Sequence, residues 1–88
     1  MAGFKPKTDH QWQKAVAHHL VGQKIVSVSF MSKDEAEEWG WYNRPIQLML
    51  SDGHQLLISQ DDEGNDGGAL FTTDKKLSIV PTLSPDDL

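Results

Sequence analysis

The sequence predicts an α+β fold: one N-terminal amphipathic helix, a short second helical turn, and a mostly antiparallel twisted sheet of about five strands. Apolar residues recur at helical spacing near the N-terminus, then alternate with a period of two over several short segments, and turn residues separate those segments. We expect the sheet to curl toward a small barrel with the helix over one face or end.

The composition limits what this chain can be. Its 88 residues suit one domain with a small core, and we assign residues 1–7 to a flexible lead-in, 8–81 to the domain, and 82–88 to an extended or frayed tail. The absence of cysteine excludes disulfides and thiolate metal sites. A net charge of −5 argues against direct binding to nucleic acid. Because no segment resembles a membrane span or a signal peptide, we expect no membrane contact and a cytoplasmic location.

The first helix is predicted to open at Thr8, which forms a capping box with Gln11, and to close at Gly22 in the left-handed conformation. Five residues recur on one face of this helix: Trp12, Ala15, Val16, His19 and Leu20. This pattern predicts that Trp12 anchors the helix in the core.

From Lys24 the pattern changes to a period of two, which predicts a half-buried strand that runs to Met31. Ser32 and Glu35 then have the spacing of a second capping box, and Gly40 is expected to end this short helical turn. The carboxylates within residues 34–38 lie near its N-terminus, where the helix dipole favours negative charge.

Two strands, 46–50 and 54–59, are predicted to form a hairpin. A two-residue turn would leave both faces of the hairpin mixed, whereas a three-residue loop with Gly53 in a left-handed bulge would pair Leu48 with Leu56 and give one apolar face. We therefore predict the bulged hairpin. Two further short strands are expected at 69–73 and 77–80.

An aromatic loop, residues 39–45, is one candidate functional surface. Trp39, Trp41, Tyr42 and Arg44 are of the types that dominate protein interfaces, because each combines a large contact area with a polar group. The alternative is that the loop covers an open end of the sheet as a lid on the core. We predict that these four residues bind a protein partner.

An acidic loop, residues 60–70, is the second candidate. It fails the EF-hand pattern, since Gly64 and Thr73 occupy ligand positions counted from Asp62. A different oxygen cage for Ca²⁺ or Mg²⁺ would use these five residues: Asp61, Asp62, Glu63, Asn65 and Asp66. The alternative is a solvated loop in which Asn and Asp bond to their own backbone.

Catalytic signatures do not stand out. The histidines are scattered along the chain, and neither a serine nucleophile motif nor a phosphate-binding glycine loop is present. We therefore expect no enzymatic activity and no cofactor beyond the divalent cation considered above.

Several segments carry a resemblance to a known group of proteins. They are IVSV at 25–28, WGW at 39–41, SDG at 51–53 and, most specifically, DDEGNDGGALF at 61–71. With this order the chain, from about residue 20 to 83, resembles a set of short bacterial proteins that form a domain of uncharacterised function. The resemblance implies a bacterial, non-secreted protein and adds no activity.

Three hypotheses for the function follow. The first is a small non-enzymatic protein-binding domain that presents the aromatic and acidic loops to a partner. The second is a divalent-cation-binding domain that uses residues 61–66. The third is an acidic inhibitor that occupies the nucleic-acid-binding site of another protein.

Overall fold

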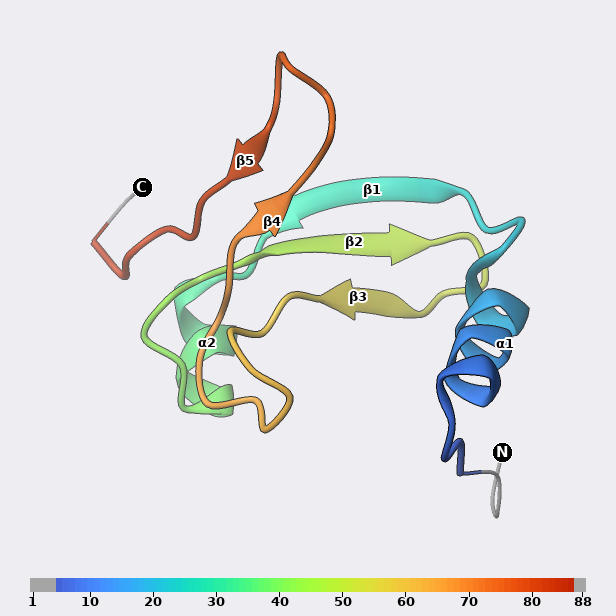
Figure 1. The fold of residues 1–88 in the computed structure, drawn as a ribbon. Coiled ribbons are helices and arrows are strands. Elements are labelled where there is room, and N and C mark those ends of the chain that lie inside the picture. Colours follow the sequence, from blue (N-terminus) through green and yellow to red (C-terminus); the bar gives the residue numbers. More distant parts are fainter. Residues whose placement is uncertain (1–4, 87–88) are drawn as a thin grey trace.

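The computed structural model describes residues 5–86, which form two helices and five strands in an α+β arrangement (Figure 1). In chain order the elements are α1 (Asp9–Leu20), β1 (Ile25–Phe30), α2 (Lys33–Trp39), β2 (Ile46–Leu50), β3 (Gln55–Leu57), β4 (Leu70–Phe71) and β5 (Ile79–Val80). Positions 1–4 of the predicted lead-in and positions 87–88 of the predicted tail lie outside the described residues.

The central sheet is antiparallel with the order β1-β2-β3. Val28 lies opposite Leu48, and Leu48 lies opposite Leu56, so the three side chains form one row on the same face. The hairpin has the predicted bulged register, because Gly53 adopts a φ of 92° and Leu50 N–H donates to the His54 carbonyl at 2.8 Å. A bulge also interrupts β1 between Ile25 and Ser27.

The predicted single sheet of about five strands is wrong in one respect: the strands divide into two sheets, and they close no barrel. β4 and β5 form a separate two-stranded sheet with Leu70 opposite Val80. The reason is that β3 ends at Leu57 and the chain then enters the acidic loop, where only the isolated bridge of Ser59 to Gly67 continues the pairing. With two residues in each of β4 and β5, little backbone is available to extend the larger sheet.

The predicted N-caps Thr8 and Ser32 and the left-handed Gly40 are confirmed, but the return bonds of the two predicted capping boxes are not formed: Gln11 Oε1 accepts from Lys7 N–H instead, and Glu35 Oε1 from Gln47 Nε2. Thr8 Oγ1 accepts a hydrogen bond from Gln11 N–H at 3.1 Å, and Ser32 Oγ accepts one from Glu35 N–H at 3.1 Å. Gly40 ends α2 in the left-handed conformation with a φ of 77°. These caps form because each needs only residues within one turn of the helix.

The core lies around α2 and the aromatic loop. Met31, Ala36 and Trp41 are buried together, and the half-buried Leu57 of β3 packs against them. Gln47 of β2 is also buried, and its Nε2 donates to Glu35 Oε1 at 3.2 Å, which joins the sheet to α2. The most deeply buried part of the molecule is therefore near one end of the sheet.

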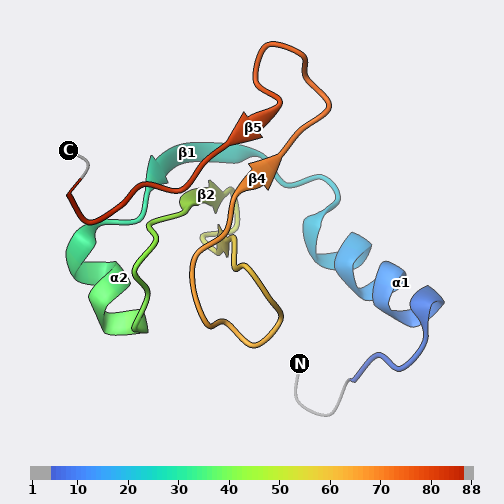
Figure 2. The same cartoon turned by 60° about the vertical axis from the view of Figure 1, so that its left-hand side comes forward.

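α1 stands apart from this core (Figure 2). None of its twelve residues, all of which the structure describes, is buried, and Trp12 is 56% exposed. The prediction that Trp12 anchors the helix in the core is therefore wrong. Periodicity shows which face of a helix is apolar, but it does not show what that face contacts.

Part of the segment predicted as an extended or frayed tail pairs with the aromatic loop. Arg44 N–H donates to the Leu83 carbonyl at 2.8 Å, and Leu83 N–H donates back to Arg44 at 2.9 Å. This pairing places residues 82–84 beside the aromatic loop.

Neither helix in residues 5–86 has the length and apolar character needed to span a bilayer.

Candidate functional site

Hydrogen bonds bring the aromatic and acidic loops together at one end of the molecule. Trp41 Nε1–H donates to the Gly64 carbonyl at 2.7 Å. Asn43 donates twice to the Asp66 carboxylate, from its backbone N–H at 2.8 Å and from Nδ2 at 3.0 Å. Two segments more than 20 residues apart in the chain thus form one structural unit, which lies beside α2 (Figure 1).

Close backbone packing fixes this unit, and it requires glycine at two positions. A Cβ atom at Gly67 would lie 2.5 Å from the Asn43 carbonyl oxygen and 2.7 Å from Pro45 Cδ. A Cβ atom at Gly68 would lie 2.9 Å from the carbonyl oxygen of Ser59. The two glycines therefore let residues 67–68 approach the aromatic loop and the segment that follows β3 more closely than any side chain would allow.

Asp61 organises the tip of the acidic loop. Its Oδ1 accepts hydrogen bonds from the N–H groups of Glu63 at 3.1 Å and Asn65 at 3.2 Å, and its Oδ2 accepts one from Asn65 Nδ2 at 2.9 Å. These bonds, with the Asn65 side chain first, hold the pKa of the Asp61 carboxyl below its usual value, because they stabilise the charged form. The loop thus has the internal bonding expected of an Asx turn.

The five residues predicted to bind a cation are not gathered into a cage. Asp61 bonds to its own loop, Asp66 bonds to Asn43, and Asp62 and Glu63 are exposed. Across residues 5–86, no three or more His, Asp or Glu side chains form a group that could hold a metal ion. Cation binding stays a prediction.

The four predicted partner-binding residues occupy two kinds of environment. Trp41 is only 6% exposed and belongs to the core, whereas Trp39 is 53% exposed and Tyr42 is 61% exposed. The centroids of the Trp39 and Trp41 rings lie 5.2 Å apart, so the exposed ring packs against the buried one. Arg44 Nε–H donates to the Met31 carbonyl at 2.8 Å, so this side chain links the aromatic loop to the residue that follows β1.

Negative charge is concentrated around these aromatic residues. We call residues 33–44 and 61–66 together the acidic end. It holds eight of the 13 acidic residues and two of the eight basic residues, which gives it a net charge of −6. Since the whole chain carries −5, the rest of the molecule is close to neutral.

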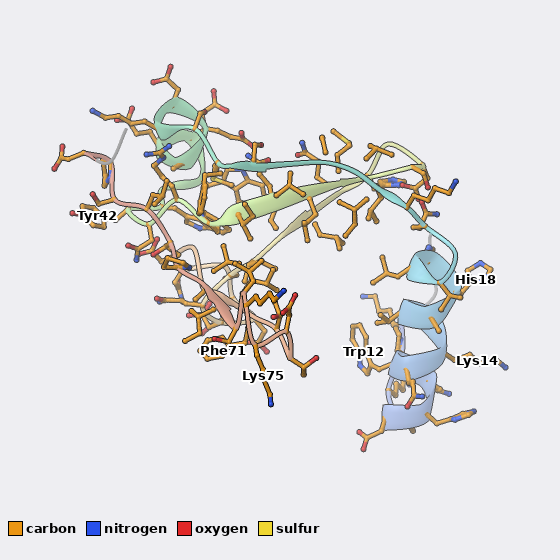
Figure 3. The ribbon with its side chains drawn as sticks, turned by 90° about the horizontal axis from the view of Figure 1, so that it is seen from above. Trp12, Lys14, His18, Tyr42, Phe71 and Lys75 are labelled. Carbon is orange, nitrogen blue, oxygen red and sulfur yellow. The ribbon has the colours of Figure 1, made fainter. Side chains whose placement is uncertain are left out.

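Sequence reasoning missed a second surface, which we call the open face. It consists of the exposed side chains of Trp12 and Val16 on α1 and Ile25 and Val28 on β1, with Leu48 as its floor. In Figure 3 Trp12 lies on the side of α1 nearer the hairpin that carries Phe71, and Lys14 and His18 lie on the opposite side. A signal was present in the sequence, namely the apolar face of the first helix, but that face was assigned to the chain's own core.

No protein-family model, curated protein or solved structure matches this chain. The fold and the site are therefore interpreted from the structure alone.

Proposed function

We propose that this chain is a small non-enzymatic protein-binding domain that uses its acidic end to bind a partner with a basic surface and an apolar recess. The observation that carries the proposal is the joining of the two loops. The bonds of Trp41 to Gly64 and of Asn43 to Asp66 place two exposed aromatic side chains, Trp39 and Tyr42, within a surface of net charge −6.

Each part of this surface has a separate physical role in binding. The carboxylates steer a basic partner by long-range attraction, which mainly raises the association rate. The exposed aromatic side chains supply contact area that is removed from water when the partner binds. Trp39 ends α2 and contacts the buried Trp41, so little conformational entropy is lost when this anchor is fixed.

The test compares the proteins captured by the wild-type chain with those captured by a Trp39→Ala/Tyr42→Ala double variant. The matched control is Phe71→Ala, because Phe71 is an aromatic residue on β4 that is even more exposed (72%) and lies outside the acidic end. For a purified partner we expect the double variant to weaken binding at least about tenfold and the control to leave it unchanged.

The dependence on salt supplies the second readout. Raising the salt concentration from about 0.05 to 0.5 M screens the carboxylates and should weaken binding markedly. The proposal fails if a folded double variant binds every partner as tightly as the wild type does. It also fails if binding does not depend on salt.

A further inference from the structure

The chain exposes more surface than a compact monomer of its size. Its accessible surface is 6978 Å², whereas a compact monomer of this mass exposes about 5,200 Å². The radius of gyration is 14.5 Å, against about 12 Å for a compact domain of this length. The excess of about 1,800 Å² lies within the 1,000 to 2,500 Å² that each subunit of an obligate homodimer buries.

Several of the exposed large apolar side chains are on the open face. Ile25 is 60% exposed, Val28 56% and Val16 47%. Compact monomers rarely expose large apolar patches to water. A hollow of about 370 Å³ at the junction of α1 and the sheet is lined in part by Leu20, Leu50 and Leu56. The apolar faces of the helix and of the sheet therefore border the same open space.

The link between α1 and β1 is fixed to the β2–β3 turn. Gln23 Oε1 accepts hydrogen bonds from Ser51 Oγ at 2.8 Å and from Asp52 N–H at 3.0 Å. Lys24 N–H donates to Ser51 Oγ at 3.1 Å, and Ser51 N–H donates to the Lys24 carbonyl at 2.9 Å. These bonds fix residues 23 and 24 beside the β2–β3 turn, so α1 starts from a defined position at one end of the sheet.

The charge distribution allows two copies to meet at this face. Eight of the 13 acidic residues lie at the acidic end, and in α1 Asp9 is balanced by Lys14. Contact through the open face therefore does not bring two strongly negative surfaces together. A second copy also carries both required parts, an unpartnered apolar helix face and an unpartnered apolar sheet face.

We propose that the open face is the interface of a symmetric homodimer in which α1 of each copy packs on the sheet of the other. The reciprocal exchange covers Trp12 and Val16 of one copy with Val28, Leu48 and Leu56 of its partner. The dimer then contains two equivalent contacts, each between α1 of one copy and the sheet of the other, as two-fold symmetry requires. This interface is separate from the acidic end, which stays free for another protein.

The first test is sedimentation equilibrium of the full chain over a range of concentrations. We expect the mass of two chains at the higher concentrations. The variant Val16→Lys places a charge on the apolar face of α1 and should raise the dimer dissociation constant at least about tenfold. The matched control is His18→Lys, because His18 lies on the opposite side of α1 (Figure 3), and it should leave that constant unchanged.

The second test shows which copy's helix lies on which sheet. In a mixture of isotope-labelled and unlabelled wild-type chains, isotope-filtered NMR should show contacts between the Trp12 indole of one copy and the methyl groups of Leu48 and Leu56 of the other. A one-chain mass at all concentrations overturns the proposal. So does a dimer that Val16→Lys leaves intact, or Trp12 contacts confined to a single chain.

Discussion

The two ends of this molecule achieve order in opposite ways. The acidic end is rich in charge and glycine, yet it surrounds the most deeply buried side chains, because hydrogen bonds such as Trp41 to Gly64 join its loops. The α1 end has a regular amphipathic pattern, yet none of the residues of α1, each of them described, is buried. An apolar pattern alone therefore does not place a segment in the core, and a polar loop can complete one.

The change with the largest expected effect tests whether the core depends on the aromatic loop. Trp41→Ala removes a buried ring and its bond to Gly64, and it should lower the free energy of unfolding by about 3 to 5 kcal/mol. The measurement is urea unfolding followed by circular dichroism. Trp39→Ala is the control, and since its ring is 53% exposed the cost should be about 1 kcal/mol. Equal unfolding midpoints would contradict this account of the core.

A smaller effect is expected from the close approach of the two loops. Gly67→Ala places a Cβ atom 2.5 Å from the Asn43 carbonyl oxygen, so the loops must move apart, at a cost of about 2 to 3 kcal/mol. Gly64→Ala meets no neighbouring atom within 4 Å and strains only its own backbone at a φ of +73°, at a cost of about 1 kcal/mol. Thermal unfolding of both variants measures the difference, and a Gly64→Ala cost above that of Gly67→Ala would refute the packing argument.

At the other end, Gln23→Ala should release α1 without unfolding the sheet. It removes the acceptor for Ser51 Oγ and Asp52 N–H, and we expect a loss of about 1 kcal/mol because these bonds are exposed. NMR relaxation should show faster motion in residues 9–20. Gln13→Ala within α1 is the control and should change neither quantity. If α1 moves no more in the Gln23 variant than in the control, the link does not hold the helix.

The smallest effect concerns pH at the tip of the acidic loop. The pKa of Asp61 in the folded chain is lowered from 3.8 by its bonds to Asn65, so the carboxylate form stabilises the loop above that value. The stabilisation is lost as the pH falls from about 4 through the lower folded pKa. Amide exchange of Glu63 and Asn65 should therefore become progressively less protected as the pH falls below about 4, while α1 is unaffected. Asp61→Asn should abolish this dependence.

Local features of this fold were predictable from the sequence because they depend on neighbouring residues. The caps at Thr8 and Ser32 and the left-handed Gly40 each involve contacts within about one turn. The bulged hairpin was predictable for a related reason, since only the register that pairs Leu48 with Leu56 gives the hairpin one apolar face. Of the candidate site, the sequence indicated both loops and their residue types.

The tertiary structure alone decided how these pieces meet. It buried Trp41 while leaving Trp12 exposed, and it also left exposed Trp39, which is only two residues from Trp41. It also joined Asn43 to Asp66 and left the open face uncovered. The physical reason is that burial is set by contacts between segments far apart in the chain, and residue spacing within one segment carries no information about its partner.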